Sequence, residues 1–299
     1  MQTYPLGQFT VGRVGFGAMQ LPGPGVFGPP RDRDEALAVL RRAIELGINH
    51  IDTAQFYGPD VANELIREAL HPYPANLALV SKVGGRRDDQ GAWLPAHEPD
   101  ALREDIETNL GSLEVDRLAA VNLRVMDPES EDPSKPATVN RELFDRQLTA
   151  MIQARDEGLI AGIGLSNVSR EHLQIALDRT EIVCVQNAYN LVDRTSQPVL
   201  DTCLEHAIAF VPFFPLGSGF TADNPVLGHP AIQSEASKLG RTPAQIALAW
   251  TLSVAPNVLL IPGTSSVQHL EENTAVADIE LDDDTRRQLD DAASSDQSD

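Results

Sequence analysis

The stretch GINHIDTAQFYGPDVANELIREALHPYPANLALVSKV (47–83) shows the repeating unit of the fold most clearly. It contains two short apolar runs, HIDTA (50–54) and LALVSKV (77–83), and the spacing between them leaves room for a helix. Short runs of β-branched and apolar residues that alternate with longer helical segments are typical of βαβ units. The stretch therefore predicts two parallel strands of one sheet, joined by a helix.

The same alternation continues along the whole chain. Eight runs qualify as strands, and a helix fits after each of them. Because eight parallel βα units close a sheet without leaving an edge, we predict an α/β fold, a (β/α)8 TIM barrel. The predicted strands are VGFGAMQ (14–20), HIDTA (50–54), LALVSKV (77–83), LAAVNLR (118–124), AGIGLSN (161–167), IVCVQNA (182–188), IAFVPFF (208–214) and VLLIPG (258–263).

Helix boundaries are marked at several points. Asp32 stands three residues before Glu35, like a capping box at a helix start. Thr242 is expected to cap a second helix, with a proline at the first helical position and Gln245 completing the box. A last helix is predicted over 281–292, followed by a disordered tail at about 294–299. No linker divides the chain, so we expect a single barrel domain over residues 1–299.

Composition narrows the classes of function. The chain has 299 residues, 42% of them hydrophobic, and a formal net charge of −21. Nucleic acids and anionic membranes bind basic surfaces, so neither is an expected partner. The stretch MQTYPLGQFT (1–10) has no basic start followed by an apolar run, so no secretory signal is expected, and Cys184 and Cys203 have no metal-binding spacing. We expect a cytoplasmic protein with two reduced thiols and no metal, acting on a small molecule as a monomer or small homo-oligomer.

Two long connections follow predicted strands. One runs from Gly84 to about Pro99 and contains Arg86, Arg87 and Trp93; the other runs from Met126 to about Thr138. Both follow the carboxyl ends of strands, the face where barrels of this kind carry active sites. Either these are active-site loops or they are plain surface loops, and the sequence leaves both interpretations open.

Three polar residues stand at or just beyond strand ends: Asp52, Tyr57 and Lys82. In a parallel barrel these ends converge on one mouth. A lysine that closes an apolar run is partly desolvated and needs a carboxylate, which Asp52 can provide. The structural interpretation is a buried ion pair at the barrel top, with Tyr57 as a surface aromatic. The functional interpretation makes Tyr57 a general acid, because a neighbouring ammonium makes a phenol a stronger acid.

Several motifs then resemble the aldo-keto reductase family. GINHIDTAQFYG (47–58) looks like the family signature with Asp52 and Tyr57 five residues apart, and LVSKVG (79–84) resembles the segment with the catalytic Lys82. The resemblance runs from about residue 12 to residue 280 in the right order. It implies reduction of an aldehyde or ketone by a nicotinamide cofactor, with Tyr57 as the proton donor.

The resemblance also implies a cofactor site at the barrel mouth. GIGLSN (162–167) and VQNAYN (185–190) look like the segments that hold the nicotinamide carboxamide, and PFFPLGSG (212–219) resembles the segment whose aromatic, Phe213, stacks on the nicotinamide. LIPGTSSVQHLEEN (260–273) resembles the adenosine-phosphate segment. The implied cofactor-binding residues are Gly17, Ala18, Met19, Ser166, Asn167, Gln186, Phe213, Leu216, Gly217, Ser218, Gly263, Thr264, Ser265, His269, Glu272 and Asn273.

The chain departs from the family pattern at the fourth strand. The family has a histidine where VNLRVMD (121–127) has Arg124. An arginine can still polarise a carbonyl and stabilise a developing alkoxide, although it is always charged. The alternative is that Arg124 pairs with Asp52 or Asp127 and supports the structure only. Together with GAMQLPGPGVFGPP (17–30) and 56–74, this segment resembles a bacterial branch that includes pyridoxal reductases, which makes pyridoxal a candidate substrate.

The preference for NADPH or NADH depends on the adenosine-phosphate segment at 260–273. Family members read the 2′-phosphate of NADPH with lysine or arginine there, but this chain has Gly263, Thr264, Ser265, Ser266 and His269. Hydroxyl and backbone N–H groups at a helix start also bind phosphate. NADPH is therefore the expected cofactor, with NADH as the alternative.

Two other functions remain as alternatives. Loss of the family histidine is compatible with a regulatory or partner protein that binds the cofactor with weak or no catalysis. A barrel isomerase or aldolase that forms a Schiff base on Lys82 is the other alternative, and the Ser166, Asn167 and Gln186 motifs speak against it.

Overall fold

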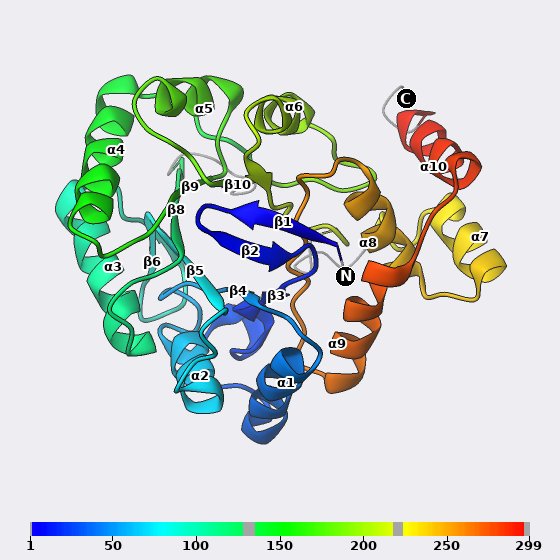
Figure 1. Cartoon of the computed structure of the whole chain (residues 1–299), viewed down its shortest axis with the longest axis horizontal. Coiled ribbons are helices and arrows are strands. Elements are labelled where there is room, and N and C mark those ends of the chain that lie inside the picture. The colour runs from blue at the N-terminus through cyan, green and yellow to red at the C-terminus, as the bar shows by residue number, and fades with distance from the viewer. Residues whose placement is uncertain (1, 128–134, 218–223, 296–299) are drawn as a thin grey trace.

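The computed structural model describes residues 2–127, 135–217 and 224–295, with side chains as far as residue 291. Seven parallel strands form a curled sheet in the order β11-β10-β9-β8-β5-β4-β3, and helices surround it (Figure 1). The strands are β3 (Phe16–Gly17), β4 (His50–Asp52), β5 (Ala78–Val83), β8 (Ala120–Arg124), β9 (Ile163–Ser166), β10 (Cys184–Gln186) and β11 (Ala209–Phe210).

The eighth predicted strand closes the barrel through two short contacts. Val258 bridges to Phe210, the last residue of β11, and Leu260 bridges to Val14 ahead of β3. The N–H of Gly15 donates to the carbonyl of Leu260 at 2.7 Å. The prediction of a (β/α)8 barrel is therefore confirmed, although run 258–263 contributes bridges rather than a full strand.

Helices follow the strands in the expected alternation. They are α1 (Arg33–Glu45), α2 (Val61–Leu70), α3 (Pro99–Leu113), α4 (Arg141–Asp156), α5 (Arg170–Leu177), α6 (Gln197–Glu205), α7 (Pro230–Leu239), α8 (Pro243–Ser253), α9 (Val267–Thr274) and α10 (Asp283–Ser295). Short 3-10 turns cover Ala18–Gln20, Pro24–Val26 and Ala275–Asp278. In Figure 1, α7 and α10 lie outside the ring, at the right of the view. Helix α10 confirms the helix predicted at 281–292 and extends it to Ser295, so residues 294–295 of the predicted tail are helical. Residues 296–299 of that tail lie outside the described residues.

The predicted helix starts are largely correct. The Thr242 side chain accepts from the N–H of Gln245, and the Gln245 side chain accepts in return, so this capping box is complete. At the start of α1, Asp32 accepts from the N–H of Glu35 at 3.0 Å. The return half of that box is absent, because the Glu35 carboxylate accepts instead from the N–H of Val267 at the start of α9.

Three segments differ from the predicted pattern. The first strand stops at Gly17, where the 3-10 turn Ala18–Gln20 follows. A side chain at Gly17 would meet the Ile261 carbonyl at 2.5 Å, so the two segments approach through bare backbone. Part of the first long connection forms an antiparallel hairpin, β6 (Gly85–Arg87) with β7 (Trp93–Pro95). A second hairpin, β1 (Thr3–Leu6) with β2 (Phe9–Gly12), lies across the open end of the barrel (Figure 1).

Apolar packing fills both sides of the sheet. One large cluster of buried residues lies between the strands and the surrounding helices. A smaller cluster joins Leu6 and Val11 of the N-terminal hairpin to Val80, Val211 and Leu259. The hairpin thus closes one end of the barrel, and the polar strand ends remain at the other.

Arg13 stabilises the contact between the first and the last strand segments of the barrel, at the end that the hairpin covers. The residue is 8% exposed, and its guanidinium donates to the carbonyls of Val258 at 3.1 Å and Ala255 at 2.7 Å, while its backbone carbonyl accepts from the N–H of Leu260. Burial lowers the pKa of this guanidinium, but the carbonyls around it satisfy its donors.

We predict that Arg13→Met lowers the free energy of unfolding by about 3 kcal/mol, because buried carbonyls lose their donors. Urea denaturation measures the change, and Arg41→Met, at an exposed position of α1, is the control. A loss no larger than that of the control would show that Arg13 does not hold the barrel closed.

Candidate active site

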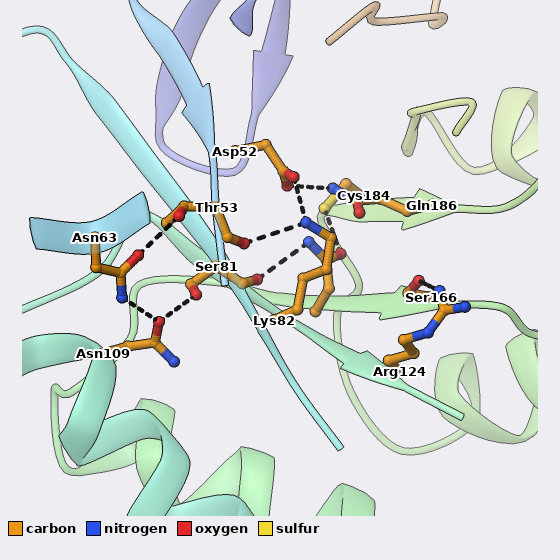
Figure 2. A network of polar contacts seen from close by, with 11 residues as sticks. Asp52, Thr53, Asn63, Ser81, Lys82, Asn109, Arg124, Ser166, Cys184 and Gln186 are labelled. Carbon is orange, nitrogen blue, oxygen red and sulfur yellow. Dashed lines mark hydrogen bonds and ion pairs between the residues drawn. The ribbon is translucent and has the colours of Figure 1, made fainter. Parts of the chain in front are cut away.

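An ion pair lies inside the polar end of the barrel. Asp52 ends β4 and Lys82 is the penultimate residue of the neighbouring strand β5, and the Lys82 ammonium contacts the Asp52 carboxylate (Figure 2). Their side chains are only 7% and 3% exposed. The ammonium also donates to the carbonyl of Thr53 at 3.1 Å. The predicted pairing of these two residues is therefore present in the structure.

The charge of Lys82 is held in place by its surroundings. Burial alone would lower the pKa of the Lys82 ammonium, but the Asp52 carboxylate and the Tyr57 side chain raise it, and the net shift is upward. The Lys82 ammonium therefore stays protonated through the neutral pH range.

Tyr57 places its ring beside that charge. The Lys82 ammonium lies 4.9 Å from the ring centroid, and the tyrosine residue is 5% exposed. Phe56 packs edge-on against this ring with a centroid distance of 5.2 Å, and Trp93 of β7 packs on Phe56 at 5.4 Å. Tyr57 is therefore a buried member of the Asp52 and Lys82 group, rather than a surface aromatic.

Gln186 reaches the same carboxylate from across the barrel. Its amide nitrogen donates to Asp52 Oδ2 at 2.6 Å, although β10 and β4 are not neighbours in the sheet. The carboxylate can only accept, so the amide oxygen, Oε1, must face away from it. This oxygen is buried and has no hydrogen-bond partner among the described residues. Gln186 thus presents one unused acceptor in the barrel mouth.

Arg124 lies between two residues predicted to hold the nicotinamide. Its Nη1 donates to the hydroxyl of Ser166 at 3.2 Å (Figure 2), and its guanidinium carbon lies 5.4 Å from the centroid of the Phe213 ring. Burial lowers the pKa of Arg124, and Tyr57 opposes this shift. Tyr57 therefore acts electrostatically on Arg124.

The remaining nicotinamide candidates cluster nearby. Asn167 has a left-handed backbone, with φ of 59°, and its side-chain nitrogen donates to the carbonyl of Val125 at 3.1 Å. Leu216 packs partly buried against the main core, and Gly217 has φ of 84°. Ala18 is fully buried, whereas Met19 is partly exposed. Ser218 lies outside the described residues.

The adenosine-phosphate candidates form a separate group. Gly263 approaches the backbone of Gly17 so closely that a side chain on it would lie 2.6 Å from the Gly17 carbonyl. Thr264 caps the loop by accepting from the N–H of Ser266 at 3.1 Å, and Ser265 and His269 are exposed. Glu272 accepts from Gln268 on the same helix, and Asn273 is 9% exposed. No contact described joins them to Asp52 or Lys82.

The outer side of the barrel carries a polar network that was not predicted from the sequence. Thr53 donates to Asn63 of α2 at 2.7 Å, and Ser81 donates to Asn109 of α3 at 2.6 Å (Figure 2). Asn63 in turn donates to Asn109 at 3.0 Å. Thr53 and Ser81 directly adjoin Asp52 and Lys82, and side chains alternate along a strand. The network therefore anchors the backbone from which the ion pair projects.

Comparison with known proteins agrees with this geometry. The Aldo/keto reductase family model matches residues 13–294. Pyridoxine 4-dehydrogenase of Escherichia coli (strain K12) is 47% identical over 288 residues, which cover 96% of this chain and 97% of that protein. An uncharacterised oxidoreductase of Schizosaccharomyces pombe is 37% identical and covers 98% of this chain and 90% of its own. An aldo/keto reductase from Klebsiella pneumoniae, crystallised with NADP and acetate, has a TM-score of 0.77 at 27% identity, with 97% and 94% of the two chains covered.

The chain belongs to the aldo/keto reductase family. It is accordingly an NAD(P)H-dependent oxidoreductase, and the family resemblance is confirmed. Across the described ranges, no helix is long and apolar enough to cross a membrane.

His50 is a further buried polar residue that the sequence analysis did not identify. It stands two residues before Asp52 on β4, is 1% exposed, and has no hydrogen-bond partner for either ring nitrogen in the described part of the chain. Burial lowers the pKa of His50 to about 4, with Asp52 opposing the shift and Lys82 adding to it. The ring is therefore neutral in the folded protein near neutral pH.

This predicts acid sensitivity with a defined sign. The unfolded chain binds a proton at His50 below about pH 6.5, whereas the folded chain does not bind it until about pH 4, so stability falls with pH across that window. His50→Gln should remove up to about 1.4 kcal/mol per pH unit from the slope of unfolding free energy against pH there. The exposed His206→Gln is the control, and an unchanged slope in His50→Gln would contradict a neutral buried imidazole.

Proposed function

We propose that this chain reduces an aldehyde or ketone to an alcohol with NADPH, and that Tyr57 is the general acid. The observation that carries the proposal is the buried Lys82 and Asp52 pair with the Tyr57 ring 4.9 Å from the ammonium. A fixed positive charge beside a phenol stabilises the phenolate that is left after proton transfer. The arrangement therefore favours release of the Tyr57 proton to a carbonyl oxygen at the mouth.

The site suits a nicotinamide cofactor. The unused Gln186 oxygen is an acceptor for a carboxamide N–H, and the Ser166 hydroxyl and the Phe213 ring both contact Arg124. The Klebsiella pneumoniae structures were determined with NADP and with NADPH, which supports the same cofactor class here. When bound, the cofactor supplies the hydride. The residues of this chain orient its ring, exclude water and deliver the proton.

Each remaining residue has a defined part in that step. Asp52 holds Lys82 charged, and Gln186 orients Asp52 through its amide nitrogen. Arg124 presents donors in a planar fork close to Tyr57, so it can hold a carbonyl oxygen as negative charge develops on it. Arg124 also has a second role, because its hydrogen bond to the Ser166 hydroxyl positions a residue of the nicotinamide site.

Pyridoxal is the candidate substrate. A relative with 47% identity over nearly the whole chain is called pyridoxine 4-dehydrogenase, and the aldehyde that corresponds to pyridoxine is pyridoxal. Tyr57 belongs to an aromatic cluster in which Phe56 packs on its ring and Trp93 packs on Phe56, and such a cluster suits a planar aromatic aldehyde.

The proposal also includes the domain organisation and the cellular location of the enzyme. We infer one domain for residues 1–299 and a cytoplasmic location, which the two buried, unbridged thiols Cys184 and Cys203 support.

Tyr57→Phe tests the mechanism. Turnover of pyridoxal or a panel of aldehydes, followed by NADPH absorbance, should fall by about two to four orders of magnitude, because general acid catalysis contributes that much. The dissociation constant of NADPH should change less than about twofold, because Tyr57 is not a predicted cofactor contact.

Tyr73→Phe is the matched control, since Tyr73 donates to the Leu113 carbonyl away from the mouth. Full activity of Tyr57→Phe would refute the proposed acid. Tight NADPH binding with no turnover by the unmodified protein would instead favour a regulatory protein on the same scaffold.

A further inference from the structure

The final βα loop presents no lysine or arginine to a phosphate, since Gly263, Thr264, Ser265 and Ser266 are followed by His269. The start of α9 is also largely occupied by the protein itself. The N–H of Ser266 donates to the Thr264 hydroxyl at 3.1 Å, and the N–H of Val267 donates to the Glu35 carboxylate at 3.0 Å. A carboxylate already sits where a helix start would attract an anion, so this helix end alone is a poor phosphate site.

A cationic side chain from the connection between β3 and α1 lies close to the final βα loop. A cavity of about 300 Å³ opens between the final loop and the connection that leads from β3 to α1. Ser265 lines it on one side, and Gln20, Arg31 and Asp32 line it on the other. The close approach of Gly17 and Gly263 explains this neighbourhood, because it joins the two strands from which the loops emerge.

Arg31 is the one cationic side chain that lines this cavity among the described residues. In the described part of the chain it makes no ion pair, whereas Arg33, two residues later, is paired with Glu68. Most arginines of this acidic chain bind a neighbouring carboxylate in the same way. Arg31 therefore faces the cavity with its charge uncommitted.

The connection that carries Arg31 is held in shape. The N–H of Gly23 donates to the carbonyl of Gly28 at 3.1 Å, and a side chain at Gly23 would lie 2.6 Å from the carbonyls of Phe27 and Pro29. Prolines further restrict the backbone on both sides of this turn. The position of Arg31 beside the cavity thus follows from a tightly folded loop rather than a long free segment.

We propose that Arg31 recognises the 2′-phosphate of NADPH from the first βα loop, in place of a cation on the last one. This rests on the proposed function. Asp32 and Glu35 bring two carboxylates close to the same place, and they repel a phosphate monoester unless a cation offsets them. NADH carries a ribose hydroxyl at that position instead, which such carboxylates tolerate or accept from. Arg31 is then the residue that sets the preference for NADPH over NADH.

Binding measurements on Arg31→Gln test this directly. Dissociation constants for NADPH, NADH and 2′,5′-ADP are measured by calorimetry or by fluorescence, without substrate. The account predicts that Arg31→Gln weakens NADPH and 2′,5′-ADP at least about tenfold, as expected for a charge-assisted bond. Binding of NADH should change less than about twofold, and Arg31→Lys should recover part of the loss.

Arg33→Gln is the matched control, because its partner is Glu68 on the surface and it does not line the cavity. Equal weakening of NADPH and NADH would overturn the proposal, since it would place Arg31 on a phosphate that both share. Unchanged NADPH binding would overturn it as well. Neither outcome depends on turnover, because only binding is measured. A loss of reductase activity can therefore be distinguished from a failure of Arg31 to bind the 2′-phosphate.

Discussion

The ion pair of Lys82 and Asp52 is the interaction on which the site depends. Two charges that are almost entirely removed from water are costly, and they persist only where geometry and further hydrogen bonds compensate for desolvation. Here the Thr53 carbonyl accepts a second hydrogen bond from the Lys82 ammonium, and the Gln186 amide nitrogen donates to Asp52 Oδ2. The pair holds the Lys82 ammonium at a fixed place in the barrel mouth, and the Tyr57 ring packs against that ammonium.

The rest of the barrel holds that pair at a defined place. Strands β4 and β5 are adjacent, so their inward side chains meet, and the Thr53, Ser81, Asn63 and Asn109 network fixes the outer side of the same strands. Closure at Val258 and Leu260 brings the last loop beside the first. The cofactor candidates at Gly17 and Gly263 are neighbours for this reason, although 246 residues separate them in sequence.

The sequence was sufficient for features that repeat locally. Periodic apolar runs located seven strands and most helices, and the polar residues at strand ends identified Asp52 and Lys82. Contacts between distant segments could not be found this way. The Glu35 carboxylate fits the pattern of a local capping box, yet its partner is Val267, 232 residues away. Gln186 matched a nicotinamide motif, but its bond to Asp52 crosses the barrel. The roles of Arg124 and of the cofactor residues stay predictions.

A double-mutant cycle on Lys82→Met and Tyr57→Phe tests the central claim most directly, that the ion pair acts through the tyrosine proton. The rate of the chemical step is measured in single turnovers for the parent, both single variants and the double variant. We expect the double variant to be about as slow as Tyr57→Phe alone, because Lys82 cannot assist proton transfer once the Tyr57 hydroxyl is absent. Losses that multiply in the double variant would contradict it, since Lys82 would then act independently of Tyr57.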